Sequence, residues 1–112
     1  MNTKLLLEIK KHILTHPKQL NMGTWMTKTN CGTTCCIAGW ACLLSKELYA
    51  NTNVWRFAEK ILDIEGESDR LFHTEDWPTK YRNLYYDAGS SEARAKVTAD
   101  RIQHYIDTGG LE

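Results

Sequence analysis

Long apolar runs and an excess of charge of either sign are both absent from this 112-residue sequence. The 14 basic and 14 acidic residues give a formal net charge of zero, and no run of like charge is longer than Lys10-Lys11. A protein without a basic surface has little electrostatic attraction for a phosphate backbone or an anionic bilayer. We therefore expect neither nucleic acid nor a membrane among its partners.

The earliest apolar run, Leu5-Leu6-Leu7, is followed directly by Glu8. It is too short for a signal-peptide core or a membrane span, so the sequence predicts a cytoplasmic protein. Thiols remain reduced in that compartment, and a disulfide between the adjacent Cys35 and Cys36 would be strained. The four cysteines are therefore expected to be free thiols.

Internal repeats, low-complexity segments and linkers are also missing, and the length is below that at which two cores become common. Residues 1–112 are therefore predicted to form a single domain. No stretch alternates between apolar and polar residues for long enough to indicate a strand. The expected fold is a compact all-α domain of about five helices.

The boundaries of these helices follow from apolar spacing and from capping residues. A long loop, from Pro17 to Thr33, is expected before the second helix, and a brief turn through Leu71 and Phe72 before the fourth. The predicted helices run from Asn2 or Thr3 to about His16, from Thr33 or Thr34 to about Leu48, from Asn53 toward Gly66, from Thr79 to Asp87, and from Ser90 or Ser91 to Gly109-Gly110.

The stretch from Asn30 to Leu44 contains all four cysteines, a glycine turn and the start of an apolar helix. If the helix begins directly after Gly32, its unpaired backbone N–H groups can bind a phosphate or a carboxylate. The predicted ligand contacts are the backbone of Gly32, Thr33, Thr34 and Cys35, with Trp25 or Tyr85 stacking on a base. The plainer interpretation is a simple N-cap without a ligand.

A nucleophilic cysteine is the alternative, because a helix N-terminus lowers the pKa of a thiol. The candidate nucleophiles are Cys31 and Cys36, and the candidate bases are His73 and His104. The order of residues does not decide which histidine lies near which cysteine.

A zinc site would have to use Cys31, Cys35 or Cys36, Cys42 and His73. The sequence has neither paired Cys-x-x-Cys knuckles nor a His-x-x-x-His motif, so its spacing argues against structural zinc. We therefore expect no metal site and no cofactor.

The segment Cys31–Ala41 reads Cys-Gly-Thr-x-x-Cys-Ile-Ala-Gly-Trp-Ala and resembles the signature of a family of small bacterial and bacteriophage proteins. The resemblance extends over most of the chain, through His16-Pro17, Met22 to Trp25, Leu71-Phe72, Trp77-Pro78 and the closing Gly-Gly helix. It implies a phage or prophage setting in a bacterial or phage-infected cell. It implies no catalytic residues, and its second cysteine corresponds to Cys36.

Three functions are compatible with these patterns. The first is a non-enzymatic binding protein, such as a phage accessory factor that sequesters an anionic, nucleotide-like ligand or blocks a host protein. The second is a cysteine-dependent hydrolase or transferase. The third is a structural protein-interaction module that associates with itself as a homodimer.

Overall fold

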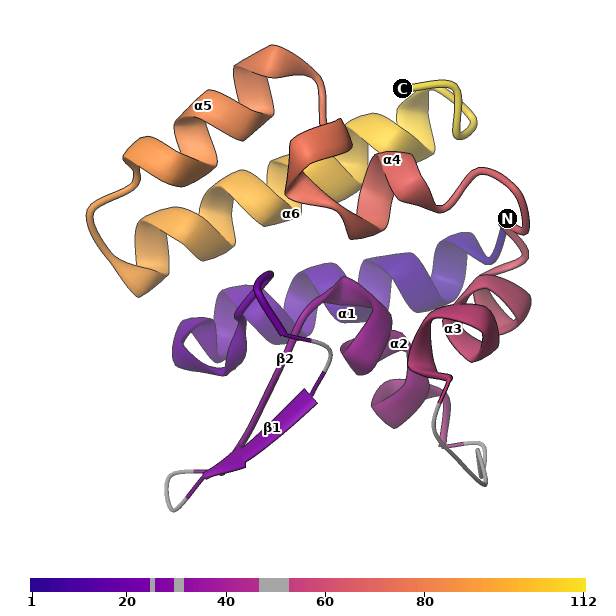
Figure 1. Ribbon diagram of the computed structural model, residues 1–112, viewed down its shortest axis with the longest axis horizontal. Coiled ribbons are helices and arrows are strands. Elements are labelled where there is room, and N and C mark those ends of the chain that lie inside the picture. The colour runs from indigo at the N-terminus through magenta and orange to yellow at the C-terminus, as the bar shows by residue number, and fades with distance from the viewer. Residues whose placement is uncertain (25, 30–31, 47–52) are drawn as a thin grey trace.

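The computed structural model describes residues 1–24, 26–29, 32–46 and 53–112. These residues form six α-helices, two short 3₁₀ segments and one β-hairpin (Figure 1). The predicted all-α fold class is therefore confirmed. In chain order the elements are α1 (Thr3–Thr15), η1 (Pro17–Gln19), β1 (Met26–Thr29), β2 (Gly32–Cys35), α2 (Ile37–Ser45), α3 (Val54–Leu62), α4 (Asp69–Phe72), η2 (Thr74–Asp76), α5 (Thr79–Asp87) and α6 (Ser91–Asp107).

The first helix begins and ends where its sequence predicts. The side chain of Asn2 accepts a hydrogen bond from the backbone N–H of Leu5 at 3.1 Å, which satisfies one of the unpaired donors of the first turn. The helix ends at Thr15 because Pro17 restricts the residue before it. The predicted apolar stripe of α1 is buried, and it consists of Leu5, Leu6, Ile9 and Ile13.

Helices α1 and α6 form the centre of the molecule and run in opposite directions, with the two chain ends at the same end of the pair (Figure 1). Helices α4 and α5 lie along one side of α6, whereas α2 and α3 lie beyond α1. The hairpin projects from the α2 side, away from α5 (Figure 1).

The last helix also follows its predicted pattern. The side chain of Ser90 accepts a hydrogen bond from the backbone N–H of Ala93 at 3.1 Å and caps the helix. Ala95, Ala99 and Ile102 are buried, and the chain leaves the helix through Gly110, whose φ of +85° favours glycine.

The prediction that the second helix starts at Thr33 or Thr34 is wrong. Residues 26–29 and 32–35 pair as antiparallel strands, with Met26 opposite Cys35 and Thr29 opposite Gly32. Threonine is β-branched and favours strands, and this stretch is rich in threonine. The helix begins only at Ile37, with Cys36 as its N-cap.

Two helix ends also differ from the predictions. Helix α3 ends at Leu62 because Asp63 adopts a left-handed conformation with a φ of +57°, so Gly66 lies in the following turn. Helix α2 ends at Ser45, and its predicted end near Leu48 lies outside the described residues. Among the described residues, no helix has the length and apolar character needed to cross a membrane.

Candidate functional site

Cys36 occupies the junction between β2 and α2. Its backbone N–H donates to the carbonyl oxygen of Thr24 at 3.0 Å, and its own carbonyl accepts from the N–H of Trp40 at 3.0 Å. One residue earlier, the carbonyl of Cys35 accepts from the N–H of Asn21 at 3.0 Å. These bonds hold the segment from Asn21 to Thr24 against the start of the helix.

The thiol of Cys36 is buried, with only 1% of the residue exposed. Burial raises the pKa of the Cys36 thiol, while the backbone N–H groups of Gly39 and Ala38 at the start of α2 act in the opposite direction. The cost of taking a thiolate out of water is the larger effect. The helix N-terminus therefore faces a neutral thiol at ordinary pH.

His73 directly follows α4 and lies across from this junction. Its Nε2 atom is 3.6 Å from Oδ1 of Asp69, one helical turn earlier. Its ring meets the ring of Trp55 edge-on, with the centroids 5.8 Å apart. The imidazole is 38% exposed, so one side of the ring is open to solvent while the carboxylate and the indole limit its orientation.

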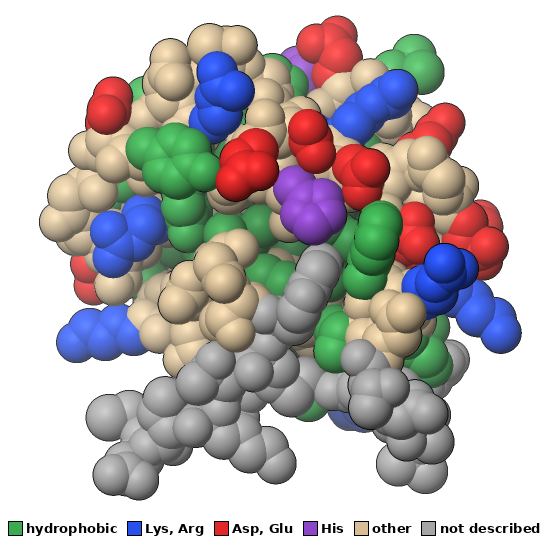
Figure 2. Space-filling view, viewed as in Figure 1, with side chains coloured by type: hydrophobic (Ala, Val, Ile, Leu, Met, Phe, Trp, Pro, Cys, Tyr) green, Lys and Arg blue, Asp and Glu red, His purple; other side chains and the backbone are tan. Residues whose placement is uncertain are grey.

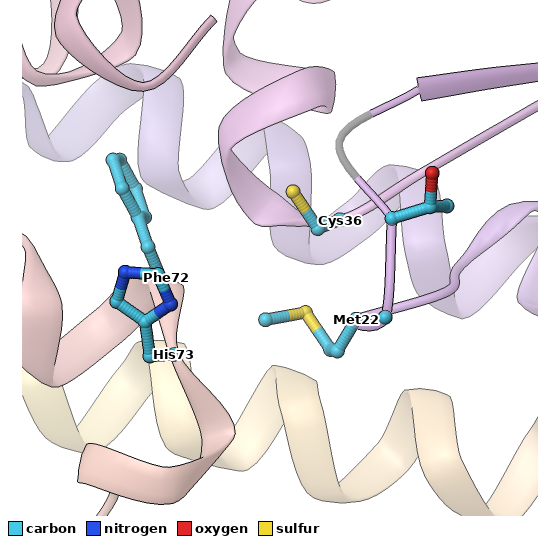
Figure 3. Close-up of a pocket in the computed structure, with 6 residues that line it drawn as sticks. Met22, Cys36, Phe72 and His73 are labelled. Atoms are coloured by element: carbon cyan, nitrogen blue, oxygen red, sulfur yellow. The ribbon is translucent and has the colours of Figure 1, made fainter.

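Cys36 and His73 line the same cavity of about 180 Å³. Figure 3 shows Met22 and Cys36 on one side of this cavity and Phe72 and His73 on the other. The remaining lining residues are Gly23 and Thr24. The structure thus brings one predicted nucleophile and one predicted base to a common space.

A second cavity, of about 460 Å³, shares Met22, Gly23 and His73 with the first. Because three lining residues are common, the two cavities adjoin, and we call them together the central groove. The second cavity adds the lining residues Asn21, Thr74, Glu75, Tyr85 and Tyr86.

Tyr85 and Tyr86 form the far end of the central groove. The hydroxyl of Tyr85 accepts from the backbone N–H of Met22 at 3.3 Å, which ties α5 to the other wall. Tyr86 is 58% exposed, and its hydroxyl is 2.7 Å from Oγ1 of Thr74. Burial is the main cause that raises the pKa of Tyr85, so this phenol stays neutral and keeps its hydrogen-bonding proton.

The structure places the other predicted ligand residues away from a helix N-terminus. Gly32, Thr33, Thr34 and Cys35 belong to β2. The helix starts after them, and its first residues Ile37, Ala38 and Gly39 are all buried. The anion site predicted for these residues therefore loses the helix N-terminus on which it depended.

The candidate base in α6 lies away from the central groove. His104 lines a separate cavity beside Tyr81, and its Nε2 atom is 3.7 Å from Oε1 of Glu112. Cys31 and Trp25 lie outside the described residues. Of the candidate catalytic residues that the structure describes, Cys36 and His73 line one cavity and His104 lines another.

Metal-ligand geometry is not found within the described part of the chain, where no group of three or more His, Cys, Asp or Glu residues can hold an ion. The three described cysteines, Cys35, Cys36 and Cys42, are all buried.

Sequence reasoning missed most of the groove. Thr74 and Glu75 were not singled out because nothing in their local sequence distinguishes them from an ordinary polar turn. Phe72 and Met22 carry a signal only as apolar residues, which predicts burial but not a cavity wall. Of the residues that line the groove, the sequence singled out Cys36 and His73 for catalysis and Tyr85 for stacking on a ligand.

Acidic side chains gather beside a histidine on the face shown in Figure 2, over α4 and the turn that follows it. The exposed acids of these elements are Asp69, Glu75 and Asp76. The mouth of the central groove is therefore negatively charged on its α4 side.

Comparison of the chain with protein-family models, with curated proteins and with solved structures returns no match. The resemblance to small bacterial and bacteriophage proteins stays a prediction. The geometry of the central groove is therefore the basis for assigning a function.

Proposed function

We propose that the chain is a small non-enzymatic binding protein and that its ligand is a small organic molecule held in the central groove. The observation that carries the proposal is the pair of adjoining cavities between the segment Asn21–Thr24 and the residues from Phe72 to Glu75. The larger cavity, of about 460 Å³, falls in the range of small-molecule pockets, and the adjoining cavity of about 180 Å³ extends it inward.

The lining favours a ligand with an apolar part and a polar part. Met22, Cys36 and Phe72 supply an apolar inner end, and Phe72 is only 2% exposed. The outer end presents hydroxyl groups from Thr74 and Tyr86. Ligand sites commonly combine an apolar wall with a few polar groups that set orientation.

The groove gives less support to the anionic, nucleotide-like ligand expected from the sequence. Neither cavity is lined by lysine or arginine among the described residues, and Glu75 contributes a carboxylate. A phosphate would meet no compensating positive charge from these walls. We therefore retain the binding function and change the ligand class.

A titration with 2-phenylethanol, followed by ¹H–¹⁵N NMR, tests this function. Binding in the groove is expected to shift the backbone signals of Gly23, Thr24 and Thr74. Tyr86→Ala removes a groove wall and should weaken the shifts, whereas Leu84→Ala removes an exposed side chain of the same helix and should leave them unchanged. Shifts that are scattered over the surface, or that Leu84→Ala weakens as much as Tyr86→Ala does, would count against the groove.

A cysteine-dependent acyl transfer is the second candidate, because Cys36 and His73 line one cavity and Asp69 lies beside the imidazole. In this reaction the Cys36 sulfur would form a bond to the acyl carbon and release the leaving group, while the thiol proton passes to His73. The raised pKa of Cys36 places this candidate second, since a neutral thiol is a poor nucleophile.

Release of p-nitrophenolate from p-nitrophenyl acetate separates the two candidates. An acyl-transfer site predicts a burst that is lost in Cys36→Ser and in His73→Ala but kept in Cys42→Ser, which removes another buried thiol. If the wild type and the three variants all release p-nitrophenolate equally slowly, catalysis is eliminated and the binding function remains in place.

A further inference from the structure

We infer that the central groove selects a small organic cation, namely a primary ammonium group attached to an apolar body. This inference rests on the proposed binding function and adds the sign of the ligand's charge. Its basis is the combination of one carboxylate, two tyrosine rings and an apolar inner end within the same walls.

Glu75 is the one lining residue with a full negative charge among the described residues of the two cavities. It is exposed, and within the described part of the chain no hydrogen bond or ion pair engages its carboxylate. Asp69 extends the negative charge behind His73, with its Oδ1 atom 3.6 Å from the imidazole. An ammonium group at the mouth would thus lie near two carboxylates.

Two arginines, Arg82 and Arg94, are directed at backbone oxygen atoms. Nη1 of Arg82 donates to the carbonyl of Glu75 at 3.5 Å, and Nη1 of Arg94 donates to the carbonyl of Ala88 at 3.5 Å. Neither residue lines the two cavities. Their charges weaken the attraction for a cation, but they provide no anion contact inside the groove.

The aromatic side chains strengthen the preference for a cation. The rings of Tyr85 and Tyr86 lie edge to face, with centroids 5.8 Å apart, at the outer end of the groove. Outside the lining of both cavities, the indole of Trp55 is 36% exposed and contacts the ring of His73. The faces of such rings carry partial negative charge and attract ammonium groups.

The inner end sets the shape of the preferred ligand. Because Met22, Cys36 and Phe72 offer no charge to an ammonium group, the apolar body should occupy this end while the cation stays near Glu75. A free metal ion or a compact inorganic cation would use only the mouth. The ligand class is therefore an amine with a hydrophobic tail or ring.

Three probes with the same phenyl body test the inference: 2-phenylethylammonium, 2-phenylethanol and 3-phenylpropionate. NMR titration at low salt should give the tightest binding for the cation and the weakest for the carboxylate, with a difference of about tenfold or more between these two. Added salt should reduce the affinity for the cation and leave that for the alcohol nearly unchanged.

Two variants that each remove one carboxylate test whether Glu75 causes the preference for the cation. Glu75→Gln should lower the affinity for the ammonium probe several-fold and leave the alcohol unaffected. Glu65→Gln, a change of an exposed acid outside both cavities, should alter neither. If the alcohol binds as tightly as the ammonium probe, charge selection is overturned but the binding function stands. If no probe binds, the proposed function fails as well.

Discussion

Arg101 donates a hydrogen bond from Nη2 to the backbone carbonyl of Arg70 at 2.6 Å, although its side chain is completely buried. The other two guanidinium nitrogens, Nε and Nη1, have no hydrogen-bond partner within the described structure. The Cζ atom of Arg101 is 5.8 Å from the ring centroid of Tyr81 and 5.7 Å from that of Tyr105. Burial lowers the pKa of Arg101 to about 10, which reflects the cost of holding this cation away from water.

Replacing Arg101 by methionine is therefore expected to stabilise the fold. An apolar side chain of similar length removes the buried charge and two unsatisfied donors, which together should outweigh the lost bond to Arg70. We expect the free energy of unfolding to rise by about 1 kcal/mol in urea denaturation.

The matched control is Arg94→Met on the same helix, where the arginine is only partly buried. Its unfolding free energy should change by less than about 0.5 kcal/mol. A clear loss of stability in Arg101→Met would instead show that the ring contacts and the Arg70 bond are worth more than the buried charge costs.

The helix starts that sequence predicts well are those with a local signal. Asn53 shows this, because its side chain accepts from the N–H of Arg56 at 3.1 Å and the whole interaction lies within four consecutive residues. The hairpin lacks such a signal, since each strand has only four residues and its polar threonines do not alternate with apolar ones. Strand pairing was consequently missed, and the start of α2 was predicted too early.

At the candidate site, too, local sequence predicts which residues are reactive but not which of them come together. Cysteine and histidine chemistry predicted Cys36 and His73 as candidates, but equally Cys31 and His104. Cys36 meets His73 because α2 packs against α4, and this contact joins segments that are far apart in the chain. The acidic mouth was missed for a similar reason, because the importance of Glu75 appears only when the segment from Asn21 to Thr24 lies opposite it.

Stability should fall at alkaline pH because of the buried thiols. Burial raises the pKa of Cys35 and of Cys42 from 9.0 to about 12. Between these values the folded state keeps thiol protons that the unfolded state releases, so the free energy of unfolding decreases as the pH rises from 9 toward 12. Each thiol contributes a slope of up to about 1.4 kcal/mol per pH unit.

Cys42→Ala isolates this effect from the other groups that titrate in the same range. The variant should lose stability less steeply than the wild type when urea denaturation is compared between pH 8.5 and about 10.5. Parallel pH profiles for the two proteins would mean that the Cys42 thiol ionises equally easily in the folded and unfolded chains.

Two glycines should respond to alanine in opposite ways. Gly110 has a φ of +85°, and a Cβ there would lie 3.3 Å from Cε of Met1 and 3.4 Å from the hydroxyl of Tyr105. Gly110→Ala should therefore cost about 1 kcal/mol or more. Gly89 has open space around it and no positive φ, so Gly89→Ala should be neutral or stabilise by up to about 1 kcal/mol. Thermal melting that ranks the two variants in the reverse order would contradict this backbone argument.

Ser68, which directly precedes α4, is hydrogen-bonded to two side chains of α3, and its loss should affect both the stability of the fold and the indole beside His73. Its hydroxyl accepts from Nε1 of Trp55 at 2.7 Å and donates to Oε2 of Glu59 at 2.6 Å, while the residue is only 2% exposed. Ser68→Ala leaves an indole donor and a carboxylate without this partner, which should cost about 1 to 3 kcal/mol.

The same substitution should loosen the indole beside His73, so the fluorescence anisotropy decay assigned to Trp55 is expected to become faster. Ser91→Ala at the start of α6 is the control, since no side-chain hydrogen bond of Ser91 is found in the described structure. If Ser68→Ala lowers stability while the motion of Trp55 stays unchanged, the hydroxyl supports the fold but does not position the indole. In that case the contact of Trp55 with His73 would hold the indole in place without the hydrogen bond to Ser68.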